Sequence, residues 1–281
     1  MILVLGATGT TGGEVARQLI AAGERPRLLV RSTAKARSFE GKADLVAGDI
    51  GDVASLRTAM RGVDRLYMVA TGTDLLKLES GVVEAAVAEG VKHVVKLSVI
   101  GADAPQFSFA RWHRASEEKL MKSGLGWTMV RPTNFMSNAL GWAPSIKAQG
   151  AVYQPTGTGG WAAIDPVDIG AVAVEALLKK GHEGKAYSIT GPQSMDGAGY
   201  TAVLARVLGK PLQFVDVPPD AAKQGMLTAG MPPAYVDALI ELLAAIKAGK
   251  LDVATGTAQE LLGRKPTTFE SWAQRNEQLF S

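Results

Sequence analysis

The chain is 281 residues long, carries a formal net charge of +3, and contains 47% hydrophobic residues and no cysteine. A chain of this length and hydrophobic content can bury a large core, which argues against intrinsic disorder. The missing cysteines exclude disulfides, thiolate catalysis and cysteine-ligated metal centres. No apolar run approaches the length of a membrane span, the first residues do not resemble a secretory leader, and the basic residues form no stripe with interleaved aromatics. We therefore expect a cytoplasmic protein that binds neither nucleic acid nor membrane.

The first twelve residues, MILVLGATGTTG, are the most informative part of the sequence. Residues 2–5 form an apolar strand pattern, glycines follow at Gly6, Gly9 and Gly12, and apolar residues then recur at helical spacing. A buried strand, a glycine-rich turn and a helix are the context in which a dinucleotide binds. Gly6 permits the tight turn, Gly9 lets the backbone approach a pyrophosphate, and Gly12 lets the helix pack on the strand. The alternative is a structural turn without a ligand.

The end of the second expected strand, residues 27–30, bears on the choice of cofactor. A protein that prefers NAD usually has Asp or Glu here, where it binds the ribose 2′-hydroxyl. This chain has Arg31, with Lys35 and Arg37 close behind. A guanidinium can bind a 2′-phosphate through two hydrogen bonds. The sequence therefore favours NADPH, with NADH bound more weakly; the alternative is that Arg31 is only an exposed surface charge.

Strand and helix patterns alternate through the first half of the chain. Strands are expected at 44–47, 65–70, 92–97 and 127–130, and helices at 53–61, 75–89 and 112–123. Alternating units of this length predict an α/β fold, a Rossmann-type doubly wound parallel sheet. Ligands of such folds bind at the carboxyl ends of the strands.

The pattern loosens after residue 134. A helix is expected at 134–148, short strands at 152–153 and 161–164, a helix at 168–179 and a strand at 186–189, and the rest is mainly helical. We divide the chain into an NAD(P)-binding Rossmann domain, residues 1–134, to which some later elements return, and a smaller, mainly helical substrate or lid domain, residues 135–281. The second domain is expected to be an α/β lobe.

Several short motifs together resemble one family. They are GATGTTG at 6–12, GDI at 48–50, GVD at 62–64, KLSVIGA at 96–102, VRPTNFM at 130–136, DPVDIG at 165–170 and YSITGPQ at 187–193. With these motifs the chain resembles the NmrA-like branch of the atypical short-chain dehydrogenases/reductases over nearly its whole length. That branch includes triphenylmethane-dye reductases, NADPH-dependent azoreductases, quinone oxidoreductases and NmrA regulators.

The resemblance implies a set of cofactor contacts. For Asp49 the alternative is a turn residue that caps the strand end, and for Pro132 it is a simple strand terminator. Asn134, beside the nicotinamide, is also a candidate catalytic residue. The implied contacts are Gly6, Thr8, Gly9, Thr10, Thr11 and Gly12 for the pyrophosphate, Arg31 and Lys35 for the 2′-phosphate, Asp49 and Ile50 for the adenine, Ala70, Thr71 and Gly72 for the ribose, and Pro132, Thr133, Asn134 and Phe135 near the nicotinamide.

The chain departs from the wider superfamily in the helix after the fifth strand. Classical members place a Tyr-x-x-x-Lys pair there, but FARWHRASEEKLMKSG contains no tyrosine, and the register set by Glu117 puts Ala110 and Arg114 at the two positions. Acid–base chemistry on an alcohol is therefore poorly supported. His113 is the local candidate for a proton donor; the alternative is a packed histidine on the helix face, since no carboxylate is seen to orient it. The three histidines lack metal-ligand spacing, so no metal site is expected.

These observations favour an NADPH-dependent reductase that transfers hydride to a planar conjugated acceptor, such as an azo dye, a quinone or a triphenylmethane compound. Such acceptors are already electrophilic and can take their proton from solvent. The alternative is an NmrA-type redox sensor that binds NADP(H) without turnover. The oligomeric state is not readable. Aromatic residues that could stack on a planar substrate are Phe107, Phe109, Trp112, Phe135, Trp142, Tyr153 and Trp161, although each one alone is more often part of a core.

Overall fold

The computed structural model describes all residues, 1–281, and divides them into two compact units. Unit 1 contains residues 1–104, 110–131 and 166–188. Unit 2 contains residues 105–109, 132–165 and 189–281. The chain therefore returns to unit 1 twice, after residues 109 and 165, and each unit is assembled from three segments.

Unit 1 is built on a seven-stranded sheet with the order β3-β2-β1-β4-β5-β6-β8. The pairs from β3 through β6 are parallel, which confirms the predicted Rossmann-type doubly wound fold. The strand order reverses direction between β1 and β4, which is the position where such folds bind their ligands. The strands are β1 (Ile2–Val4), β2 (Arg27–Val30), β3 (Asp44–Ala47), β4 (Arg65–Met68), β5 (His93–Leu97), β6 (Gly126–Pro132) and β8 (Lys185–Ile189).

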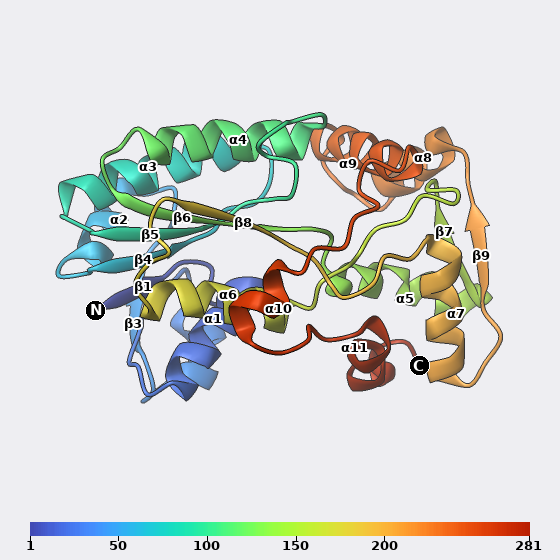
Figure 1. Ribbon diagram of the computed structural model, residues 1–281, viewed down its shortest axis with the longest axis horizontal. Helices are drawn as coiled ribbons and strands as arrows, with labels where there is room; N and C mark the ends of the chain where they lie inside the picture. Colours follow the sequence, from blue (N-terminus) through green and yellow to red (C-terminus); the bar gives the residue numbers. More distant parts are fainter. The chain divides into compact units, whose positions relative to one another are not determined.

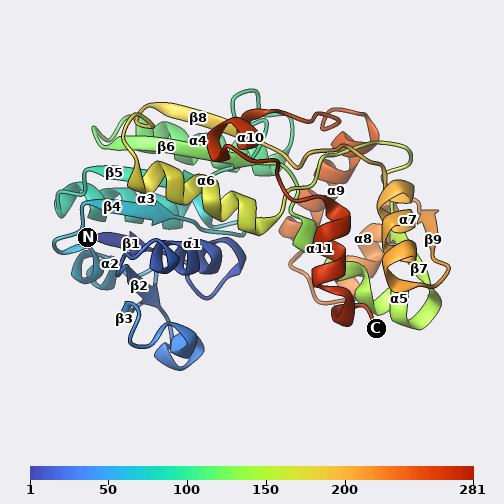
Figure 2. The same ribbon diagram turned by 60° about the horizontal axis from the view of Figure 1, so that its bottom comes forward.

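Helices cover both faces of this sheet (Figures 1 and 2). On one face lie α1 (Thr10–Ala21) and α6 (Pro166–Leu178); on the other lie α2 (Val53–Met60), α3 (Leu75–Ala88) and α4 (Ser108–Met121). Helices α1 and α6 pack closely: a Cβ on Gly170 would come within 2.8 Å of the Glu14 side chain. Gln18 Nε2 on α1 also donates to the Val167 carbonyl on α6 at 2.9 Å. A 3₁₀ segment, η1 (Thr33–Phe39), follows β2.

Unit 2 combines a parallel two-stranded sheet with short helices. Its core is aromatic: the Tyr200 ring lies 4.7 Å from both Trp161 and Phe269, and all three side chains are buried. The elements are η2 (Met136–Trp142), α5 (Ala143–Gln149), β7 (Ala151–Gln154), α7 (Gly197–Leu208), β9 (Gln213–Asp216), α8 (Pro219–Thr228), α9 (Pro233–Lys247), α10 (Thr257–Leu262), α11 (Phe269–Arg275) and η3 (Glu277–Leu279).

Several sequence-based expectations for elements were wrong in detail. The helix expected at 134–148 consists of two pieces, the 3₁₀ segment η2 and the helix α5; Pro144 stands in the first turn of α5, where its missing N–H costs no helical hydrogen bond. Residues 161–164 form only isolated bridges, from Ile164 to Phe135 and from Trp161 to Met195. The short strand β9 was missed in a region expected to be helical. Helix α4 begins at Ser108 rather than 112, and the Ser108 amide and hydroxyl both donate to Glu241, 133 residues away.

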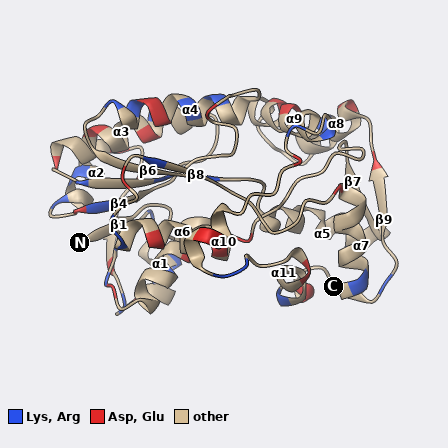
Figure 3. Cartoon of the chain, in the orientation of Figure 1, with Lys and Arg blue, Asp and Glu red and all other residues tan.

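Charged residues are distributed over the whole chain. Figure 3 shows Lys and Arg on helices, strands and loops, with Asp and Glu among them. No helix combines the length and the apolar character needed to cross a membrane.

Candidate cofactor and active site

The glycine turn after β1 leaves the N-terminus of α1 open. Gly6 has a φ of 66°, in the left-handed region that favours glycine, and the Gly9 amide donates to the Gly6 carbonyl at 2.8 Å. Gly9 is the N-cap of α1, so no side chain caps the helix, and its first turn holds no acidic residue. A Cβ on Gly12 would lie 2.3 Å from the Gly6 carbonyl oxygen. The helix therefore packs tightly on the turn and presents uncapped N–H groups, an arrangement that fits a pyrophosphate.

A basic group follows β2. Arg31, Lys35 and Arg37 are exposed, and none of them forms an ion pair within the chain. Ala36 and Phe39 are buried and hold this part of η1 against unit 1. The three positive charges are therefore free to attract an anion.

The remaining predicted contacts in unit 1 follow β3 and β4. Asp49 Oδ1 accepts a hydrogen bond from the Gly51 amide at 2.7 Å. Asp49 therefore does cap the turn after β3, which was the alternative to an adenine contact. Its Oδ2 accepts no hydrogen bond within the chain. The Ala70 amide donates to Glu79 Oε1 at 3.2 Å, and Gly72 has a φ of 91°. Because parallel strands share one carboxyl edge, the structure brings together the predicted residues of unit 1 at this edge: the glycine turn with Thr8, Thr10 and Thr11, Arg31 with Lys35, Asp49 with Ile50, and Ala70, Thr71 and Gly72.

The residues predicted near the nicotinamide belong to unit 2. Pro132 ends β6, and the Thr133 amide donates to the Ile189 carbonyl. The Asn134 carbonyl accepts from the Ile164 amide at 2.9 Å, and Phe135 precedes η2. Both line a cavity of about 40 Å³ within unit 2, which is room for water rather than for an aromatic ring. Its aromatic lining is Phe135, Trp142, Trp161, Tyr200 and Phe269, and of these Phe135 and Trp142 are only half-buried.

A buried group that sequence reasoning missed consists of Glu79, Lys96, Ser116 and His113. Lys96 on β5 and Glu79 on α3 are both fully buried, with Lys96 Nζ 2.5 Å from Glu79 Oε2. Lys96 Nζ also lies 3.2 Å from His113 Nδ1 and 3.1 Å from the Leu97 carbonyl oxygen. Ser116 donates to the same Glu79 oxygen. The sequence did carry a signal, since a lysine inside the apolar run HVVKL must be buried and therefore needs a partner.

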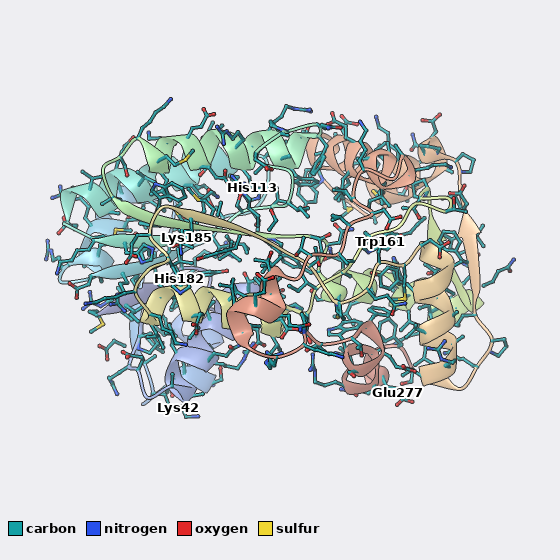
Figure 4. The ribbon with its side chains drawn as sticks, in the orientation of Figure 1. Lys42, His113, Trp161, His182, Lys185 and Glu277 are labelled. Atoms are coloured by element: carbon teal, nitrogen blue, oxygen red, sulfur yellow. The ribbon has the colours of Figure 1, made fainter.

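This group changes the interpretation of His113. Figure 4 shows His113 between α4 and the sheet of unit 1. Burial, with the positive charge of Lys96 as a second cause, holds the pKa of the His113 imidazole well below its ordinary value. His113 is therefore more than a packed histidine on a helix face. Its ring has an orienting partner, Lys96, where a carboxylate would be the usual one.

A second buried group fixes the end of β5. Ser98 Oγ donates to Glu117 Oε1 at 2.6 Å, and Arg131 Nε and Nη2 bind the two Glu117 oxygens at 2.9 and 2.7 Å. Glu117 is fully buried. The hydroxyl hydrogen of Ser98 is thus directed into the protein, and the group joins α4, β5 and β6.

Comparisons with known proteins agree with this geometry. Residues 6–180 match the family model described as NAD(P)H-binding. The chain is 39% identical to (4-alkanoyl-5-oxo-2,5-dihydrofuran-3-yl)methyl phosphate reductase of Streptomyces griseus and 38% identical to NAD(P)H azoreductase of Xenophilus azovorans; each alignment covers 100% of this chain and 99% of the relative. NADPH-dependent quinone oxidoreductase 2 of Escherichia coli, solved with NADPH, superimposes with a TM-score of 0.90 at 26% identity over 100% of both chains.

The chain therefore belongs to the NAD(P)H-binding family, and its cofactor is a nicotinamide dinucleotide. Within it, the chain is a member of the NmrA-like branch of the atypical short-chain dehydrogenases/reductases, as its motifs predicted. Three of its relatives, the two above and quinone oxidoreductase 2 of Escherichia coli, are named as reductases or oxidoreductases.

Substitutions in the glycine turn should separate binding from folding. Gly9→Val should abolish NADPH binding, because the new side chain would stand where the pyrophosphate approaches. The circular dichroism spectrum should stay near native, since a Cβ at Gly9 would come no closer than 3.3 Å to the Gly6 carbonyl oxygen. Gly12→Val should instead destabilise the fold, since its Cβ would meet that oxygen at 2.3 Å. Calorimetry with NADPH and thermal unfolding would check both, with Gly81→Ala on α3 as control, because its Cβ would make only an ordinary contact, 3.9 Å from Val53 Cγ2. Native NADPH affinity in Gly9→Val would contradict the assignment.

The Glu117 group predicts a contrast between two neighbouring carboxylates. Glu117→Gln should lower the free energy of unfolding by about 3–5 kcal/mol, because it leaves the Arg131 guanidinium largely uncompensated. Glu118→Gln should cost at most about 0.5 kcal/mol, since Glu118 pairs with Arg114 on the helix surface. Urea unfolding would measure both values; equal effects would show that the buried pair adds little.

Proposed function

We propose that the protein is an NADPH-dependent reductase that transfers hydride to a planar conjugated acceptor, such as a quinone, an azo dye or a triphenylmethane compound. The observation that carries the choice of NADPH is the unpaired basic group Arg31, Lys35 and Arg37 at the end of β2. A guanidinium there can bind a 2′-phosphate through two hydrogen bonds. The open N-terminus of α1 accepts the pyrophosphate, and the bound dinucleotide supplies the hydride.

The proposed class of acceptor is supported by the lack of a free hydroxyl donor on α4 and at the end of β5. The α4 sequence contains no tyrosine, and the Ser98 hydroxyl is committed to Glu117. Hydroxyl-based acid catalysis therefore lacks its usual donors. A conjugated acceptor needs less help, because it is already electrophilic and its reduced form can take a proton from water. The names of the azoreductase and quinone oxidoreductase relatives agree with such acceptors.

Two aromatic side chains of unit 2 are candidates for contact with the acceptor. The half-buried rings of Phe135 and Trp142 offer apolar faces to a flat molecule. Trp161 is fully engaged in the core of unit 2 and is not part of this proposal. Pro132, Asn134 and Phe135 stay predicted neighbours of the nicotinamide.

Cofactor choice can be tested at Arg31. Arg31→Asp should raise the Kd for NADPH about 10- to 100-fold and leave the Kd for NADH within a few-fold, because a charge-assisted hydrogen bond contributes about 1.5–3 kcal/mol. Fluorescence titration with both nucleotides measures this. Lys42→Asp, an equal charge change at another exposed position of unit 1, is the control and should leave both constants unchanged. An unaltered Kd for NADPH in Arg31→Asp would refute the 2′-phosphate site.

Turnover separates a reductase from a sensor. The protein should oxidise NADPH when given a quinone, an azo dye or a triphenylmethane dye, with no metal or flavin added, and deuterium at the transferred position should slow single turnovers. Asn134→Trp should impair acceptor turnover more than NADPH binding. Tight NADPH binding without turnover across this panel, together with a change in protease sensitivity, would favour an NmrA-type sensor instead.

A further inference from the structure

The buried group around Lys96 determines which nitrogen of His113 carries a proton. An ammonium has three hydrogens and can only donate. Lys96 Nζ has three acceptors within reach: Glu79 Oε2 at 2.5 Å, the Leu97 carbonyl at 3.1 Å and His113 Nδ1 at 3.2 Å. Each hydrogen therefore has one acceptor, and His113 Nδ1 receives one of them through its lone pair. A neutral imidazole with a free lone pair on Nδ1 carries its hydrogen on Nε2.

The position of Lys96 is itself secured. Its carboxylate partner, Glu79, is held on both oxygens, with the Ala70 amide on Oε1 and the Ser116 hydroxyl on Oε2 beside Lys96. Glu79 therefore cannot turn away, and the 2.5 Å contact between Lys96 Nζ and Glu79 Oε2 keeps Lys96 directed toward His113.

The Nε2–H group of His113 is left available. It forms no hydrogen bond within the chain, and the residue is half-buried. Three hydrogen bonds, which pass through Lys96 and Glu79, link His113 to the Ala70 amide, which follows β4 at the carboxyl edge of the sheet. The free donor thus belongs to the same part of unit 1 as the predicted cofactor contacts.

We propose that His113 is a catalytic residue of the reductase, whose Nε2–H donates a hydrogen bond to the acceptor atom that gains negative charge, and that Lys96 and Glu79 are positioning residues that fix this tautomer. The proposal rests on the proposed function. With a quinone, one hydride leaves the nicotinamide, which is oxidised, and its electron pair reduces the quinone to the hydroquinone anion. Water then supplies the proton that completes the hydroquinone, so His113 keeps its own hydrogen.

A neutral donor suits this role better than an imidazolium. The ring sits beside the Lys96 ammonium, and protonation of Nδ1 would place two positive charges 3.2 Å apart. Glu79 on α3 lies behind Lys96 on β5, and Glu117, one turn further along α4, is paired with Arg131; Lys96 is the charge that acts on the ring. A fixed dipole directed at developing negative charge stabilises a transition state without changing its protonation state.

The catalytic role is tested by single-turnover rates with a simple quinone. His113→Phe should slow hydride transfer about 100-fold or more, as the loss of one preorganised donor does elsewhere, and should leave the Kd for NADPH unchanged. His113→Gln, whose amide N–H can reach about the same place as Nε2, should recover at least about a tenth of the wild-type rate. His182→Phe, the same substitution at a histidine that hydrogen-bonds Tyr187 instead, is the matched control. A His113→Phe variant as fast as wild type would overturn the assignment.

The positioning role is tested by nitrogen-15 NMR of the imidazole. The wild-type protein should show His113 as the Nε2–H tautomer, with no titration between about pH 5.5 and 8. The double variant Lys96→Met/Glu79→Gln removes both buried charges together, and the His113 pKa should then rise, because a neighbouring positive charge is gone. An Nδ1–H tautomer in the wild-type protein, or titration near the ordinary histidine pKa, would refute the proposal even if the double variant failed to fold.

The two levels of the proposal fail differently. A wild-type protein that binds NADPH but turns over no acceptor would overturn the reductase, and with it the role of His113. The NMR measurement needs no turnover and still decides whether Lys96 fixes the ring. If the enzyme is active but His113→Phe does not change its rate, the catalytic role of His113 is refuted, and the proposal of a reductase still stands.

Discussion

The ammonium of Lys96 imposes the strongest constraint in unit 1. A charge buried with no exposed surface is stable only if every hydrogen finds an acceptor, and those acceptors must come from different elements. Glu79 comes from α3, His113 from α4 and the Leu97 carbonyl from β5 itself. Because Glu79 also binds the Ala70 amide, the position of the loop after β4 depends on the same charge. One lysine thereby fixes two helices and a loop at the edge of the sheet where the cofactor contacts are expected.

Unit 1 contains exposed ion pairs on its surface, buried ion pairs in its core and exposed charges without an ion pair. Those at the core, Lys96 with Glu79 and Arg131 with Glu117, are paired and hydrogen-bonded, so they hold elements in place. Those at the end of β2, Arg31 among them, have no partner in the chain and contribute nothing to holding it together. An unpaired basic group beside an open helix N-terminus keeps its charge for an external anion. Arg31 differs from other exposed charges without an ion pair, such as Lys42, because it follows β2 at the sheet edge that also holds the glycine turn.

Local patterns predicted the fold well, and long-range contacts explain where prediction stopped. Strands β2 and β3 match the expected residues, because apolar runs between turns depend on neighbours in sequence. The glycine turn was predictable for the same reason. The start of α4 was not, since Ser108 is held by Glu241, and the Lys96–His113 contact was not, since it depends on how α4 is rotated against β5. Strand β9, four residues long, exists as a strand through its pairing with β7.

The rotation of α4 determines which of its polar side chains face the sheet. His113, Ser116, Glu117 and Leu120 recur at helical spacing, so one face of α4 meets the sheet with three polar residues before it becomes apolar. Ser116 and Glu117 form their hydrogen bonds inside the protein, Ser116 with Glu79 and Glu117 with Ser98 and Arg131. His113, nearest the start of the helix, keeps one nitrogen free. Polar side chains on a helix face that packs against a core are stable only if their hydrogen-bonding groups have partners. On this face of α4, the Nε2–H of His113 is the donor without a partner in the chain, which leaves it available to a substrate.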